Sequence, residues 1–227
     1  MKSNYDKGIA FIMEGDTEYQ FYDALLLFFE RHHPDCHLTK AADDIGEPYY
    51  LLTGSFGTRI IRFNNVGTIT QIHNSVSWFN NICLGDSGFP WVVFLCYDTD
   101  AYNANISKFY LDDWQIFRDR LSKRRVSKII DMAANAEIED LFLLDLHGVS
   151  TFMQLEKELT PEDLPKGRKG SSKMKRLFIE FRKQKKTTAF YHKGERARAL
   201  IDCLNMGAII SAKLLPLQEI EKECFLN

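Results

Sequence analysis

Short apolar runs alternate along this chain with longer segments in which apolar residues recur every three or four positions. Such runs are typical of buried strands, and the longer spacing is typical of helices that pack through one face. The runs predict strands at residues 8–13, 58–63, 91–97 and 126–132. The spaced segments predict helices from residue 16, from residue 68, within 105–124, and at 138–146, 171–185 and 195–205. Residues 35–57 show no clear period, so we expect an irregular connection there.

The alternation of strands with helices predicts an α/β fold with a mainly parallel sheet and helices flanking it. From about residue 160 the alternation stops, and a loop rich in proline and glycine leads into two basic helical segments. We therefore expect an α/β domain at residues 1–150. Residues 151–227 are predicted to form a basic α-helical extension packed on it.

The bulk properties narrow the class of protein. A chain of 227 residues is long enough for a substantial core. It contains no apolar stretch long enough to cross a bilayer, and its first residues are too polar for a signal peptide. Its five cysteines are widely spaced and form no Cys-x-x-Cys pair, which favours free thiols in a reducing compartment. We therefore expect a cytoplasmic protein with no membrane partner.

Carboxylates follow three of the predicted strands at the points where the strands end. The acidic positions are Glu14 and Glu18 after the first strand, Asp98 and Asp100 after the third, and Glu137 and Glu139 after the fourth. Open α/β sheets build their sites at the carboxyl edge of the strands, and oxygen ligands suit Mg²⁺ or Mn²⁺. The pattern therefore predicts a site for one or two divalent ions at this edge.

Each acid taken alone is more often a solvated turn residue or a helix cap than a metal ligand. Three acidic strand ends together favour the metal site over this simpler interpretation. The histidines at residues 32, 33 and 37 lie close to Cys36 but lack a second pair of ligands at a zinc-finger spacing, so we do not expect a zinc site.

Several motifs occur in a recognisable order. The sequence EGDTE at residues 14–18, then Gly67, then DTD at residues 98–100 resembles a Toprim domain. The Glu-Gly-x-Thr-Glu form is similar to that of the overcoming-lysogenization-defect (OLD) nucleases and their small stand-alone relatives from bacterial and phage-defence loci. The acidic helix start at residues 137–144 and KGERA at residues 193–197 resemble later elements of these proteins.

The resemblance implies a Mg²⁺- or Mn²⁺-dependent endonuclease that hydrolyses phosphodiester bonds as the effector of an anti-phage or mobile-element system. In this resemblance Glu14 is a metal-bound or general-base carboxylate, and Asp98 and Asp100 are metal ligands. Glu18 would bind a second ion, Glu139 is a further acid, and Glu137 is a helper. Lys193 would stabilise negative charge on the phosphate. Glu137 stands where some relatives have a serine, which leaves the second metal site open.

Partners follow from the same resemblance. OLD nucleases carry an ATPase domain, whereas this chain has no Gly-x-x-x-x-Gly-Lys-Ser/Thr loop, so we expect a separately encoded ATPase partner. The oligomeric state stays open, with an exposed sheet edge or the segment near Tyr49 and Tyr50 as candidate surfaces for a homodimer.

Basic residues concentrate between residues 166 and 198, where only two acidic residues oppose them, although the chain carries a net charge of −2. This asymmetry favours binding of DNA or RNA. The candidate phosphate-binding residues are Lys166, Arg168, Lys169, Lys173, Lys175, Arg176, Arg182 and Arg196. Four aromatic residues interleave with them, and helical spacing favours a core role over base stacking for Phe178, Phe181, Phe190 and Tyr191.

Two further interpretations are open. A Toprim primase or topoisomerase is disfavoured, because the chain is too short for the additional modules that those reactions need. The alternative outside enzymology is a non-catalytic Toprim-like subunit that binds nucleic acid or protein and uses its acids only for structure.

Overall fold

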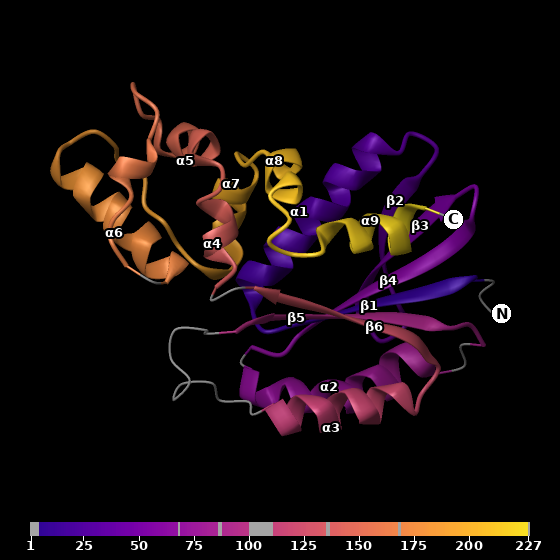
Figure 1. Ribbon diagram of the computed structural model, residues 1–227. Coiled ribbons are helices and arrows are strands. Elements are labelled where there is room, and N and C mark those ends of the chain that lie inside the picture. The colour runs from indigo at the N-terminus through magenta and orange to yellow at the C-terminus, as the bar shows by residue number, and fades with distance from the viewer. Residues whose placement is uncertain are drawn as a thin grey trace.

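The computed structural model describes residues 5–67, 69–85, 88–99, 111–134, 137–167 and 169–226. Within these residues, six strands form one mixed sheet in the order β2-β3-β4-β1-β5-β6 (Figure 1). Their bounds are β1 Lys7–Met13, β2 His37–Ala42, β3 Pro48–Gly54, β4 Gly57–Asn65, β5 Trp91–Asp98 and β6 Val126–Ala134. The neighbours β4-β1-β5-β6 pair in parallel, and β2 and β3 extend the sheet in antiparallel fashion. The predicted mainly parallel α/β sheet is thus confirmed.

Helices flank both faces of this sheet. Their bounds are α1 Asp16–His32, η1 Ile69–Asn74, α2 Ser75–Trp78, η2 Phe79–Leu84, α3 Leu111–Ser122, α4 Glu139–Phe142, α5 Leu146–Met153, η3 Pro161–Asp163, α6 Gly170–Lys183, η4 Gly194–Ala197, α7 Arg198–Ile201, α8 Met206–Ser211 and α9 Leu217–Phe225. Helices α2 and α3 lie on one face, whereas α1 and α9 cover the other, with α4 to α8 gathered beside α1 (Figure 1).

The central strands have apolar side chains on both faces, as buried parallel strands require. In β1, Ile9 and Phe11 contact the cluster under α1 and α9, whereas Ala10 and Ile12 contact the cluster under α2 and α3. All four are fully buried. The strand is apolar at successive positions because helices cover both faces of the sheet.

Residues 35–57 correct a prediction, because they form β2, β3 and the start of β4 where the sequence predicts an irregular connection. In β3 the side chains of Tyr50 and Leu52 alternate into the core. The turn between β2 and β3 is closed by Asp43, whose Oδ1 accepts hydrogen bonds from the backbone N–H groups of Ile45 at 3.1 Å and Glu47 at 2.9 Å. The turn residues that interrupt the hydrophobic pattern in the sequence are thus those that form the turn of the β2–β3 hairpin.

Some predicted helices are shorter or interrupted. The segment after residue 68 is a succession of 3₁₀, α and π turns, and the predicted helix at 138–146 is divided into α4 and α5. The division falls at Asp145, whose carboxylate caps α5 by accepting from the Gly148 backbone N–H at 3.1 Å. The predicted helix at 195–205 is η4 followed by α7, and part of the one at 105–124 lies outside the described residues.

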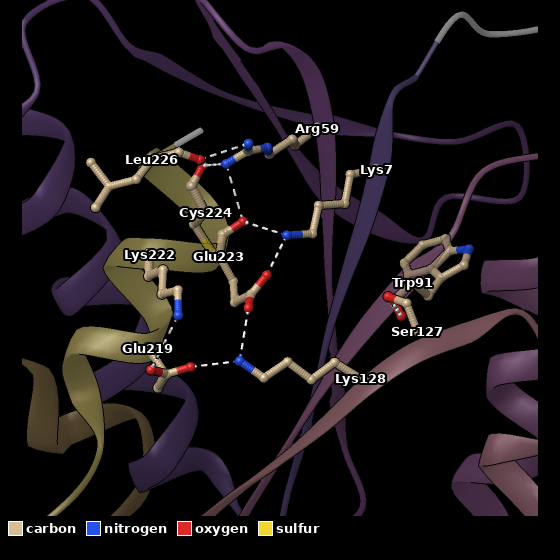
Figure 2. Close-up of polar contacts among 10 residues, drawn as sticks. All are labelled: Lys7, Arg59, Trp91, Ser127, Lys128, Glu219, Lys222, Glu223, Cys224 and Leu226. Carbon is tan, nitrogen blue, oxygen red and sulfur yellow. Dashed lines mark hydrogen bonds and ion pairs between the residues drawn. The ribbon is translucent and has the colours of Figure 1, made fainter.

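Polar contacts fasten α9 to the sheet (Figure 2). The Glu223 carboxylate accepts from Lys7 of β1 and, at 2.9 Å, from Lys128 of β6. Lys128 also donates to Glu219 at 2.6 Å. The Arg59 guanidinium of β4 donates to three carbonyl groups at the end of α9, those of Glu223 at 3.1 Å, Cys224 at 2.7 Å and Leu226 at 2.8 Å. We call Lys7, Arg59, Lys128, Glu219 and Glu223 the α9 anchor.

The anchor and a shared core join the end of the chain to its beginning. One apolar cluster contains Ile9 of β1 together with Phe178 of α6 and Phe225 of α9. The boundary at residue 150 stays a prediction. All five cysteines are free thiols, as predicted. In the part of the chain that the structure describes, no helix has both the length and the apolar character needed to cross a membrane.

Candidate active site

The carboxyl ends of β1 and β5 bring Glu14 and Asp98 to one edge of the sheet. The two strands are parallel neighbours, with Met13 paired to Cys96. The backbone N–H of Glu14 donates to the Cys96 carbonyl at 3.1 Å, and the backbone N–H of Asp98 donates to Glu14 Oε2 at 3.3 Å. The Glu14 carboxylate therefore lies against the backbone of Asp98.

Asp98 also fixes the start of α4, which carries the next acid. Its Oδ1 accepts from the backbone N–H of Ile138 at 2.9 Å, immediately before Glu139 begins the helix. The Glu139 side chain is fully buried. Its Oε1 accepts from the Tyr191 hydroxyl at 2.7 Å and lies 3.0 Å from Lys193 Nζ. Its Oε2 has no hydrogen-bond partner within the described residues.

The beginning of α1 supplies the fourth acid. Glu18 lies in the first turn of α1 and is 6% exposed. Beside it, the Thr17 hydroxyl accepts from the backbone N–H of Gly194 at 2.8 Å, which holds the segment containing Lys193 against α1. We call Glu14, Glu18, Asp98, Glu139 and Lys193 the acid cluster.

The electrostatics of the acid cluster oppose ionisation of two of its carboxyl groups, those of Glu18 and Asp98. Burial, together with the nearby charges of Glu14 and Glu139, raises the pKa of Glu18 to about 7. Burial and the charges of Glu18, Glu14 and Glu139 raise the pKa of Asp98 to about 9. Burial disfavours the charged form of Lys193, but the attraction of Glu139 outweighs it and holds the pKa of the lysine above its ordinary value. The described cluster therefore sets one cationic side chain, Lys193, against four carboxyl groups.

The donor atoms of these residues suit a hard divalent cation, but the described residues do not form a complete set of metal ligands. All the acidic donors are oxygens, and Glu139 Oε2 is buried without a hydrogen-bond partner among the described residues. Burial and neighbouring acids raise the pKa of Glu18 and Asp98, as expected for carboxyl groups that a bound cation would help to ionise. Yet among the described residues no group of three or more Asp, Glu, His or Cys is arranged to hold a metal ion. Asp100, a predicted ligand, lies outside the described residues.

Glu137, the sixth predicted acid, precedes α4, and its carboxylate contacts the start of α6. Its Oε2 accepts from the backbone N–H of Ser171 at 2.8 Å, and its Oε1 lies 3.8 Å from Lys169 Nζ. Lys173 Nζ lies 3.5 Å from Asp140 Oδ1. Gly170 allows the start of α6 to lie close to the backbone of α4, because a Cβ at this position would lie 2.5 Å from the Asp140 backbone nitrogen. These contacts fix the basic helix beside α4 and the acid cluster.

The predicted phosphate-binding residues divide into two groups. Lys169 and Lys173 form the ion pairs with Glu137 and Asp140 just described, and Arg168 lies outside the described residues. The others are exposed to solvent and comprise Lys166, Lys175, Arg176, Arg182 and Arg196. The structure thus leaves a basic surface along α6, with its amino-terminal end fixed near the acids.

The interleaved aromatic residues also divide. Phe178 is fully buried and Tyr191 is 2% exposed, which confirms the core role that their spacing favours, and Phe181 packs on the core from a partly buried position. Phe190 is 37% exposed. The pattern misses this difference, because Phe190 lies in an extended segment after α6, beyond the helical period.

Tyr191 is the site residue that sequence reasoning misses. It is separated from Glu139 by 52 residues, and nothing in its local sequence signals that its hydroxyl binds a carboxylate.

Comparison of this chain with protein-family models, with curated proteins and with solved structures gave no match.

Proposed function

We propose that this protein is a Mg²⁺- or Mn²⁺-dependent Toprim-type nuclease that hydrolyses phosphodiester bonds in DNA or RNA. The observation that carries the proposal is the acid cluster, in which four carboxyl groups from two adjacent strand ends, α1 and α4 lie close enough to affect one another's ionisation, and one of them, Glu139, pairs with Lys193. Burial and the neighbouring acids raise the pKa of Glu18 and Asp98, and an added cation would favour the ionised form of both groups. A basic surface beside the cluster supports a polyanionic substrate.

The residues have separate tasks in this proposal. Glu14 and Asp98, which meet at the sheet edge, would hold the ion, and the unpartnered Oε2 of Glu139 would offer a further oxygen. The bound ion would activate water and polarise the phosphodiester. Lys193 pairs with Glu139 at 3.0 Å and its side chain is 44% exposed, and its positive charge would stabilise negative charge on the phosphate. The exposed basic residues of α6 would bind the nucleic-acid backbone.

Other parts of the proposal rest on the motif residues alone. They are the Toprim-like form of the sheet, the role as an effector of phage or mobile-element defence, the cytoplasmic location and the separate ATPase partner. A second metal ion held by Glu18 belongs to the same group.

A non-catalytic binding subunit is the second candidate. The observation that favours it is the absence of a group of three metal-binding side chains among the described residues. In that case Lys193 would serve to neutralise the buried Glu139, and the basic surface would bind nucleic acid without cleaving it.

The test compares Asp98→Asn with Asp119→Asn, a change at an exposed aspartate of α3. Each protein is incubated with plasmid, single-stranded DNA and total RNA in Mn²⁺, Mg²⁺ or EDTA. We expect metal-dependent cleavage by the wild type and by Asp119→Asn, and a loss of at least about a hundredfold in Asp98→Asn. Mn²⁺ should also raise the melting temperature of the wild type but not that of Asp98→Asn.

The binding-subunit alternative makes the opposite prediction. No substrate would be cleaved, and Mn²⁺ would leave the melting temperatures of the wild type and Asp98→Asn equally unchanged. Cleavage that persists in EDTA or in Asp98→Asn would remove the metal site from the proposal.

A further inference from the structure

The segment between α6 and Lys193 carries an exposed aromatic pair. The rings of Phe190 and His192 have centroids 4.9 Å apart and an interplanar angle of 50°. Both residues are exposed, whereas Tyr191 between them is buried. This alternation is that of an extended chain, in which residues two apart lie on the same side. Two rings are thereby presented to solvent while the intervening tyrosine reaches Glu139.

A cation from the basic surface completes this group. The Arg182 guanidinium lies 5.2 Å from the centroid of the Phe190 ring, within cation–π range. Tyr191 packs near Phe178, which precedes Arg182 by one turn of α6. The segment that follows α6 therefore runs back along the helix towards the acid cluster. Lys193 follows Phe190 by three residues, which in an extended chain is roughly 10 Å. We call Arg182, Phe190 and His192 the aromatic platform.

We propose that the aromatic platform stacks on nucleobases, and that the substrate of this protein carries unpaired bases beside the bond that is cleaved. The inference rests on the proposed nuclease function and names the substrate class of the same site. In a duplex the faces of the bases are covered by their neighbours, so an exposed ring reaches them only in a single strand, a loop or a flipped nucleotide. Aromatic rings combined with a basic surface are the means by which proteins bind single strands.

The charges around the platform agree with such a ligand. Arg182 lies on one side of Phe190 and Lys193 on the other side along the chain, so a strand stacked on the platform would have cations beside its phosphates. Ile179 of α6 is also exposed, at 41%, but it has no aromatic face. It therefore offers a matched control for apolar contact on the same surface.

The test measures binding by fluorescence anisotropy, with Ca²⁺ in place of Mg²⁺ to prevent cleavage. The probes are a labelled single-stranded 20-mer as DNA, the same sequence as RNA, and the blunt DNA duplex. Phe190→Leu keeps an apolar side chain but removes the ring face, and we expect it to weaken single-strand binding by about five- to a hundredfold. Phe190→Trp should restore binding, and Ile179→Ala should leave it unchanged.

A spectroscopic signature separates stacking from a structural role. The fluorescence of 2-aminopurine in the single strand should be quenched further when the wild type or Phe190→Trp binds, and not when Phe190→Leu binds. Equal melting temperatures for these proteins would show that the fold is intact. The DNA and RNA arms report which of the two nucleic acids carries the unpaired base.

The outcomes distinguish this inference from the nuclease proposal. If Phe190→Leu weakens duplex and single-strand binding equally, or weakens neither, or if no nucleic acid is bound, the platform is overturned. If Phe190-dependent binding is found but no metal-dependent cleavage, the platform stands and the nuclease proposal fails. If cleavage depends on Asp98 but is unaffected by Phe190→Leu on every substrate, the nuclease stands without the platform.

Discussion

Carboxylates lie near both ends of β1, but their surroundings are opposite in charge. Near its first residue, Lys7, lies the α9 anchor, and just past its last residue lies the acid cluster. In the anchor, hydrogen bonds from Lys7 and Lys128 outweigh the effect of burial on Glu223 and hold its pKa below the ordinary value. In the cluster, burial and neighbouring acids raise the pKa of Glu18 and Asp98.

The same residue type therefore stabilises the fold at one end of the strand and opposes it at the other. The difference lies in charge balance, because the anchor sets two glutamates against Lys7, Lys128 and Arg59, whereas the described cluster sets four carboxylates against one lysine. A local excess of acid costs folding free energy unless another cation is bound. Charge balance thus separates the structural set from the candidate site.

Arg59→Met should give the largest loss of stability at the anchor. Arg59 is 7% exposed and is the donor to the carbonyl groups of Glu223, Cys224 and Leu226. Leaving these carbonyls without that donor should lower the free energy of unfolding by about 3 kcal/mol, measured by urea denaturation. A loss below about 1 kcal/mol would mean that water replaces the guanidinium and that the anchor contributes little.

Glu18→Gln should change stability in the opposite direction. At pH 8 in EDTA, removing a buried charge from the acid cluster should raise the free energy of unfolding by about 1–3 kcal/mol. The pKa of Glu18 is about 7 in the fold against an ordinary value of 4.5, so between these values the unfolded chain loses this proton first. Wild-type stability should therefore fall as pH rises from about 4.5 to 7, and the variant should lack this part of the slope.

The matched control for Glu18→Gln is Glu195→Gln, which removes an exposed charge at η4. It should leave both the stability and its pH dependence unchanged. If Glu18→Gln is less stable than the wild type at pH 8, the cluster is already compensated and the contrast with the anchor is lost.

The sequence predicts the acid cluster better than the anchor, and the reason is distance along the chain. Glu14 and Asp98 follow apolar runs directly, so the rule that parallel strands end at one edge is enough to bring them together. The anchor pairs Lys7 with Glu223, which are 216 residues apart, and no local pattern specifies that α9 returns to this face. The role of Lys193 comes from the family resemblance, and its contact with Glu139 requires the structure.

The remaining errors have local causes. The hairpin at β2 and β3 is hidden by the turn residues that form it, and Tyr50 and Leu52 give only a short alternation. Glu137 lies at a predicted acidic edge, but its contact with Ser171 depends on how α6 packs against α4. Such packing is a tertiary property that strand and helix periods do not encode.

Glu223→Gln should lower stability by less than Arg59→Met, by about 1–2 kcal/mol at pH 7, because Gln keeps a hydrogen-bond acceptor while losing the charge. The lowered pKa of Glu223 means that its contribution is present above the ordinary value of 4.5 and is lost as pH falls through the folded value. The acid side of the stability curve should therefore be flatter in the variant. An unchanged acid limb would show that the two lysines do not stabilise the ionised form.

Lys222→Ala should have the smallest effect and defines where the anchor ends. Its ammonium group lies 4.0 Å from Glu219 within the same helix, but its side chain is 63% exposed, so solvent screens the pair. We expect a change of less than about 0.5 kcal/mol in the free energy of unfolding. Lys128→Met removes two contacts to α9, at 2.6 and 2.9 Å, and should cost more than Lys222→Ala in the same urea titration. Equal losses would mean that α9 is held by general electrostatic attraction and not by the specific contacts of Lys128.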